Sequence, residues 1–113
     1  MKRYAVPLAN GQIAMHFGHA AQFAILDYDE STNTIVKNET HTPPPHEPGV
    51  LPAWLHEHGV NIIIAGGMGQ RAVMLFSQNS IEVVTGATAG TPEQVVLAHG
   101  GGNLVTGANV CDH

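Results

Sequence analysis

A strand, a glycine-rich loop and a helix start follow one another without a break in residues 60–71. Residues 60–65 are apolar and mostly β-branched, with almost no polar alternation, which is typical of a strand covered on both faces. Glycines at 66, 67 and 69 favour a tight, exposed loop, and residues 70–79 have helical spacing. The stretch therefore predicts an α/β fold whose sheet carries helices on both faces.

The same stretch predicts a place for an anion. Loop N–H groups and the partial positive charge of the first helical turn lie at the carboxyl end of the strand. Arg71 falls in that turn, where its guanidinium would offer a fixed cationic fork. The residues also allow a simpler interpretation, in which the glycines only turn the chain through positive φ and Arg71 is solvated.

Composition narrows the class of protein. With 113 residues, 43% hydrophobic and 12% charged, the chain fits one soluble domain over residues 1–113, with a flexible tail over about 103–113. A net charge of −5 argues against a general nucleic-acid binder, which needs a basic face. No apolar run is long enough to span a membrane, and we see no signal peptide. The single cysteine is consistent with a cytoplasmic protein, and we expect a monomer.

Hydrophobic patterning predicts the order β-β-β-α-β-α-β-α. Strands are expected at residues 3–8, 22–28, 34–41, 60–65 and 81–85, and helices at 49–58, 70–79 and 92–99. The short polar turn at 29–33 makes the second and third strands antiparallel, and helical crossovers make the later half parallel. Thr91 and Pro92 suit the N-cap and the first residue of the third helix. We therefore expect a mixed sheet with residues 60–65 at its centre.

Eight histidines are unusual in a chain this short. His16 and His19 are three residues apart, in a loop at a strand's carboxyl end, where α/β sheets usually bind ligands. Residues 66–71 should emerge at the same end, so we expect the two loops to face one another across an open crevice. His46 lies in a proline-rich loop, residues 42–52, and is expected near the rim.

Catalytic signatures are missing from the sequence. The serines at 31, 77 and 80 have no nucleophile elbow around them, and the cysteine lies in the tail. There is neither a phosphate-binding loop with lysine nor a dinucleotide fingerprint. We therefore expect a protein that is not an enzyme, and a small hydrolase is disfavoured.

Three segments together resemble a known family. They are MHFGH at residues 15–19, IIIAGGMG at 62–69 and IEVVTGA at 81–87. At this spacing, over nearly the whole chain, they resemble the dinitrogenase iron–molybdenum cofactor biosynthesis family, in which the orange protein of sulfate-reducing bacteria looks nearest.

The resemblance implies a ribonuclease-H-like three-layer fold with a mixed five-stranded sheet and about three helices. It also implies non-catalytic binding or carriage of an anionic molybdenum-containing metal–sulfur cluster, iron–molybdenum cofactor-like or molybdenum–copper sulfide. Proteins that donate or accept the cluster would be the partners. The main alternative is a regulatory or scaffolding module that binds a partner protein without any cofactor.

Motifs and resemblance together give a candidate site. The expected cofactor-binding residues are His16, Phe17, Gly18, His19, His46, Gly66, Gly67, Met68, Gly69, Gln70 and Arg71. Of these, His16 and His19 are the candidate metal ligands, although two ligands alone do not define a metal site. The tail Cys111-Asp112-His113 could hold a soft metal but is not a fixed feature of the family, so we assign it no role.

Overall fold

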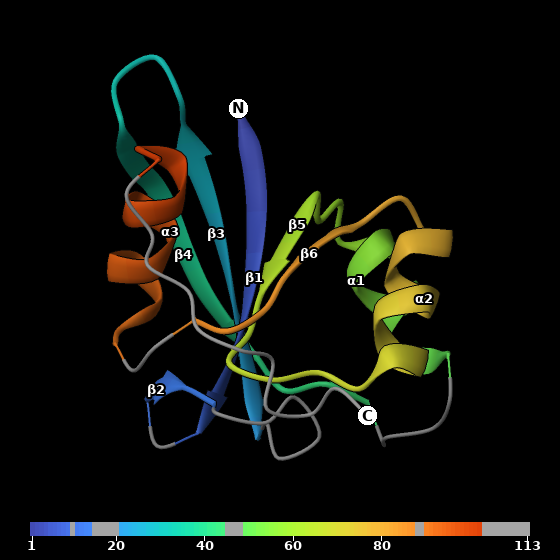
Figure 1. The fold of residues 1–113 in the computed structure, drawn as a ribbon. Coiled ribbons are helices and arrows are strands. Elements are labelled where there is room, and N and C mark those ends of the chain that lie inside the picture. The colour runs from blue at the N-terminus through green and yellow to red at the C-terminus, as the bar shows by residue number, and fades with distance from the viewer. Residues whose placement is uncertain (10, 15–20, 45–48, 88–89, 103–113) are drawn as a thin grey trace.

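A mixed β-sheet forms the middle layer of the protein (Figure 1). The computed structural model describes residues 1–9, 11–14, 21–44, 49–87 and 90–102. The strands are β1 (Lys2–Ala9), β2 (Gln12–Ile13), β3 (Gln22–Asp29), β4 (Thr34–His41), β5 (Ile62–Ile64) and β6 (Glu82–Val84). Their order across the sheet is β4-β3-β1-β5-β6, and the two-residue β2 pairs with the end of β1.

Strand directions confirm the predicted mixed sheet. β3 is antiparallel to both β1 and β4, whereas β5 is parallel to both β1 and β6. β5 is interior and completely buried, but β1 holds the middle place, so the expectation that residues 60–65 are central is wrong by one strand. β1 can take that place because it is buried on both faces over residues 4–8. The short β2 was not expected.

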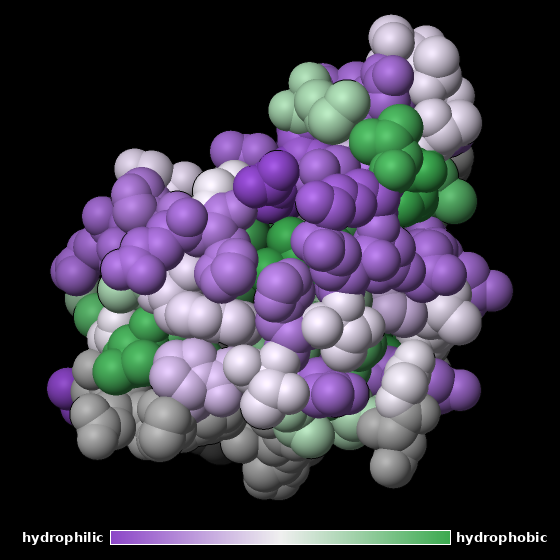
Figure 2. Space-filling model, turned by 180° about the vertical axis from the view of Figure 1, so that it is seen from behind, coloured by the Kyte–Doolittle hydropathy of each residue, from purple (hydrophilic) through white to green (hydrophobic). Residues whose placement is uncertain are grey.

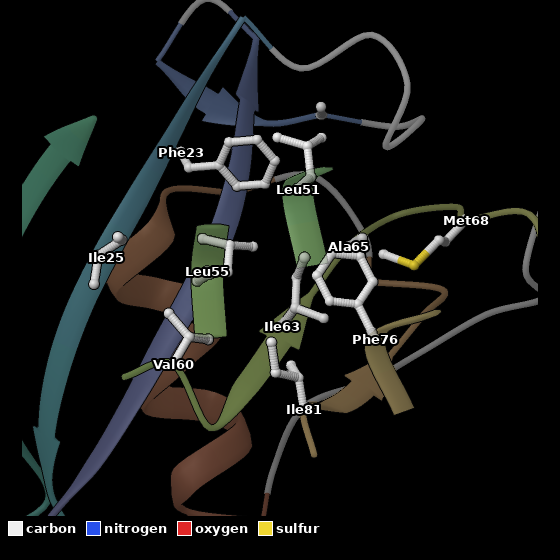
Figure 3. Packing of buried hydrophobic residues seen from close by; sticks show 12 residues of the cluster. Phe23, Ile25, Leu51, Leu55, Val60, Ile63, Ala65, Met68, Phe76 and Ile81 are labelled. Carbon is white, nitrogen blue, oxygen red and sulfur yellow. The ribbon is translucent and has the colours of Figure 1, made fainter. Parts of the chain in front are cut away.

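Helices cover both faces of the sheet, as the strand pattern predicted (Figure 1). On one face lie α1 (Val50–Glu57) and α2 (Gln70–Gln78), and on the other lies α3 (Pro92–Gly100). Figure 3 shows Leu55 of α1 and Phe76 of α2 pointing toward Ile63 of β5. The α3 face is built around Val95 and Val96 of the helix, both buried against the sheet.

The sheet's direction decides where the helices begin. β4 is antiparallel to β3, and β3 is antiparallel to β1, so β1, β4, β5 and β6 all end at one edge, in the lower half of Figure 1. We call this the carboxyl edge. Each helix directly follows one of these strands and therefore begins there. Within the described residues, no helix is long and apolar enough to cross a membrane.

Candidate functional site

Main-chain hydrogen bonds hold the carboxyl edge together behind β5 and β6. The Ala65 N–H donates to the Val84 carbonyl at 2.9 Å, and the Ala87 N–H donates to the Ala65 carbonyl at 3.2 Å. One residue further on, the Gly86 N–H donates to the Gly66 carbonyl at 2.8 Å. These main-chain hydrogen bonds therefore fix the start of the glycine loop to residues 84–87, at the end of β6.

The end of β1 is fixed at the same edge. The Ala14 N–H donates to the Pro7 carbonyl at 2.8 Å, and the Ala21 N–H donates to the Leu8 carbonyl at 2.9 Å. These residues flank segment 15–20. The predicted site residues His16, Phe17, Gly18, His19 and His46 lie outside the described residues. Their part in a shared crevice therefore stays a prediction from the sequence.

The glycine loop itself differs from expectation. Gly66, Gly67 and Met68 are buried, and only Gly69 is partly exposed, so the expectation of an exposed loop is wrong for its first three residues. The cause is Met68, whose side chain turns inward toward Phe76 in the core (Figure 3). In this structure Met68 has no exposed surface.

Positive φ is not what selects these glycines. Among the described residues, the glycines with positive φ are Gly11, Gly49, Gly59, Gly86 and Gly102. Gly66 and Gly67 are not among them, and Gly69 has a φ of −66°. The positive φ in this part of the edge is at Gly86, where φ is 79° and the N–H bonds to the Gly66 carbonyl. Gly86 is therefore the glycine that turns the chain through positive φ in this part of the edge.

Helix α2 begins at the carboxyl edge without a side-chain cap. Gly69 is the N-cap, with φ −66° and ψ 154°, and no acidic residue stands in the first turn. Gln70 and Arg71 are exposed there. Within the described residues, Arg71 makes neither an ion pair nor a side-chain hydrogen bond. The uncapped first turn of α2 and the Arg71 side chain thus both carry positive charge at the start of this helix, within the part of the chain that the structure describes.

The other two helices begin differently from one another. α1 also starts from a glycine, Gly49, with no side-chain cap and no acidic residue in its first turn. α3 starts from Thr91, whose Oγ1 accepts from the Gln94 N–H at 3.3 Å, while Gln94 Oε1 accepts from the Thr91 N–H at 3.0 Å. This capping box, with Glu93 in the first turn, confirms the predicted start of α3.

The described histidines do not gather at the glycine loop. His41 at the end of β4 lies beside His58, with ring centroids 5.0 Å apart, and Trp54 lies 4.8 Å from His58. His56 is exposed, and its Nδ1 bonds to the Asn79 carbonyl at 3.0 Å. No group of three or more His, Cys, Asp or Glu in the described ranges is arranged to hold a metal ion.

A small polar hollow lies on the open part of the α1 face, beside β4, and the sequence reasoning missed it. Its volume is about 70 Å³, and its floor includes the buried Ile25; polar side chains gather on this side of the molecule (Figure 2). The lining residues are Arg3, Ile25, Asp27, Lys37, Glu39, His41 and His58. Alternation along residues 37–41 could have placed three of them on one face.

An ion pair forms one wall of this hollow. Arg3 Nε donates to Asp27 Oδ1 at 2.7 Å, Arg3 Nη2 donates to Oδ2 at 3.3 Å, and Nη1 donates to the His58 carbonyl at 2.6 Å. The hydrogen bond from Arg3 lowers the pKa of Asp27. Because both charges are already paired, this hollow is not an obvious anion site.

Comparison with known proteins relates most of the chain to one family. The family described as dinitrogenase iron-molybdenum cofactor matches residues 1–101. An uncharacterized protein of Methanocaldococcus jannaschii is 29% identical over 100 residues, covering 86% of this chain and 85% of its own. The crystal structure of a protein designated PH0822 is 31% identical, with a TM-score of 0.82 over 92% of this chain and 93% of its own.

The fold is shared more widely than the sequence. The apo form of the orange protein from Desulfovibrio gigas has a TM-score of 0.72 and 24% identity, over 96% of this chain and 95% of its own. At that identity the likeness shows a common fold. It agrees with the mixed sheet and three helices described above.

Proposed function

Because the chain belongs to the dinitrogenase iron-molybdenum cofactor family, we propose that it binds an anionic, molybdenum-containing metal–sulfur cluster at the carboxyl edge. The cluster is iron–molybdenum cofactor-like or a molybdenum–copper sulfide. The protein holds it as cargo without catalysing a reaction, and exchanges it with donor and acceptor proteins.

The start of α2 carries this proposal. Gly69 supplies no capping side chain, no acid stands in the first turn, and Arg71 is exposed beside it. A Cβ built on Gly69 would meet no heavy atom of the described chain beyond its two neighbours within 4 Å, so there is room beside the cap residue. Helix N–H groups and a guanidinium fork are the donors that bind multiply charged anions well.

Net charge makes this local arrangement necessary. The chain carries a formal charge of −5, so long-range attraction cannot bring an anionic cluster to it. The positive potential must come from groups within one Debye length, about 8–10 Å, of the bound cluster. The N-terminus of α2, together with Arg71, meets that requirement.

The histidine loop supplies the second half of the proposed site. His16 and His19 would contribute imidazole nitrogen, either to the metal or as donors to sulfide, and His46 would close the rim. If imidazole ligates metal, His16→Ala or His19→Ala changes the absorption spectrum of the bound cluster. If imidazole only donates hydrogen bonds, these changes lower the affinity and leave the spectrum alone.

Metal analysis separates cluster binding from the cofactor-free scaffold. Protein purified without oxygen should contain molybdenum in a fixed ratio to protein and should absorb visible light. The apoprotein should bind tetrathiomolybdate, a dianionic molybdenum sulfide, either alone or with copper(I). A colourless, metal-free protein that binds neither probe would support the scaffolding alternative and overturn the proposal.

Arg71→Ala tests where the anion binds. We expect it to weaken tetrathiomolybdate binding by about 1–3 kcal/mol, the scale of a charge-assisted hydrogen bond, measured by titration calorimetry. Because Arg71 is exposed and unpaired among the described residues, the free energy of unfolding should hardly change.

Lys2→Ala is the matched control for Arg71→Ala. It removes the same unit charge from an exposed side chain at the opposite edge of the sheet, where β1 begins. If net charge alone governed affinity, both variants would weaken binding equally. Equal effects, or an unchanged affinity in Arg71→Ala, would place the anion away from α2.

A further inference from the structure

Strand β4 forms an open edge of the sheet. It is eight residues long and, within the described chain, pairs only with β3. Its last residue, His41, packs on α1 through Trp54, with ring centroids 6.3 Å apart, but six of its residues are exposed. Such an edge presents a row of main-chain donors and acceptors to any strand of matching pattern.

The side chains of β4 divide between the two faces of the sheet. Lys37, Glu39 and His41 line the hollow on the α1 face, and Asn38 and Thr40 therefore point to the other face. Lys37 Nζ lies 3.4 Å from Glu39 Oε1, with both side chains more than half exposed. The edge thus displays one positive and one negative group, two residues apart and open to solvent.

We propose that β4 pairs with β4 of a second copy of this chain, antiparallel and about a two-fold axis, in the register centred on Asn38. This register sets Lys37 of each copy directly opposite Glu39 of the other, so two opposite-charge pairs form at once. The interface is isologous, as in every two-fold dimer, so the same residues of both copies form it.

Symmetry leaves few alternatives to this register. A two-fold axis through the sheet keeps each residue on its own face, so the axis must pass through a residue pair of the same number. Centring on Lys37 or on Glu39 sets two like charges opposite one another, which destabilises a sheet. Centring on Thr40 pairs residues 39–41 without a pair of opposite charges, whereas centring on Asn38 pairs residues 37–39 with two such pairs and reaches the bulge at Val36.

The register also covers the apolar surface of the edge. Val36 is 53% exposed and unpaired, because the ladder passes from Asp27–Lys37 to Tyr28–Ile35 and leaves a bulge. In the proposed dimer Val36 lies next to the pair of Lys37 with Glu39 of the second copy, at the end of the regular ladder. A bulge and a lysine ordinarily discourage edge pairing. In this register the lysine lies opposite a carboxylate, which it does in none of the other symmetric registers, so these charges favour this register.

Charge exchange tests the pairing in solution. Lys37→Glu and Glu39→Lys should each raise the dimer dissociation constant about tenfold, since each sets two like-charge pairs in place of two attractive ones. The double variant Lys37→Glu with Glu39→Lys should return to the wild-type value. Analytical ultracentrifugation over a concentration series measures the dissociation constant, and circular dichroism checks the fold of each variant.

A disulfide tests the register itself, in a Cys111→Ser background that removes the only native cysteine. Asn38→Cys should cross-link two copies, because directly opposed Cα atoms lie about 4.5–5.5 Å apart, within disulfide range. Thr40→Cys is the matched control on the same exposed face. Its two copies would be offset by four residues, about 13 Å, and should not cross-link.

Three results would overturn the proposal. One is a wild-type protein that stays monomeric across the concentration series. Another is a double charge variant that is no stronger a dimer than the single ones. The third is cross-linking through Thr40→Cys in preference to Asn38→Cys, which would show a different register.

Discussion

Helices α2 and α3 begin at the same edge of the sheet, but their N-termini differ in capping and in the charge of the first turn. At α3, Thr91 and Gln94 bond to one another's backbone, and Glu93 adds a negative charge to the first turn. At α2, the cap residue is Gly69, and the charged residue of the first turn is Arg71. The protein's own side chains thus cap the N-terminus of α3, whereas among the described residues no side chain caps that of α2.

The two helices also differ in how firmly they are held. His99 in the last turn of α3 shares a hydrogen bond of 2.8 Å with the Tyr4 hydroxyl, and burial raises the pKa of Tyr4 to about 12. Gly100 packs directly on the Tyr28 ring. By contrast, Phe76 is the one buried residue of α2, and Met74 is 61% exposed. We infer that α3 is a structural helix and that α2 presents a site.

The largest expected effect is at the end of α3. Gly100→Ala would place a Cβ too close to the hydroxyl end of the Tyr28 ring, so the helix or the ring must shift. We expect a loss of about 1–3 kcal/mol in the free energy of unfolding, measured by urea denaturation. The sign is informative, because Gly→Ala within a helix ordinarily stabilises by up to about 1 kcal/mol. A stabilised variant would mean that α3 is not held tightly against β3.

The next effect concerns the α3 cap. Thr91→Ala removes the acceptor for the Gln94 N–H and should cost about 1 kcal/mol of stability. Thr91→Ser keeps a hydroxyl and should cost much less. Neither change should alter tetrathiomolybdate binding if α3 is purely structural. Weaker binding in Thr91→Ala at unchanged fold would show that the two helix ends share one ligand.

Local patterns in the sequence predicted the elements well. Alternation gave the bounds of β4 at Thr34 and His41, and the threonine–proline pair gave the start of α3. Each of these signals acts over a few residues, where sterics and capping decide the outcome. The start of α2 at Gln70 followed in the same way from the glycine before it.

Features that depend on distant residues were not predictable in the same way. The central place of β1 depends on which strands pair across the sheet, and the Arg3–Asp27 ion pair depends on the register of β1 with β3. Met68 was expected in an exposed loop, because no residue near it in the sequence indicates that its side chain packs in the same core cluster as Phe76. The histidine half of the candidate site stays a prediction, since it lies outside the described residues.

The smallest change in stability belongs to a substitution that would make α2 resemble α3. Gly69 already has N-cap geometry, at φ −66° and ψ 154°, and open space where a Cβ would stand. Gly69→Asp should therefore cap the free N–H groups and stabilise the apoprotein by a few tenths of a kcal/mol. The same carboxylate would occupy the positive helix end, so tetrathiomolybdate binding should be lost. Gly69→Asn is the matched control.

Asparagine separates capping from charge at this position. It caps a helix about as well as aspartate does, so its effect on thermal unfolding should be similar. Without the negative charge it should weaken tetrathiomolybdate binding less than Gly69→Asp does. If Gly69→Asp binds the anion as tightly as the wild type, the end of α2 is not the anion site. The difference between α2 and α3 would then concern helix stability alone. A helix end that accepts a carboxylate while the anion still binds cannot be the place where the anion binds.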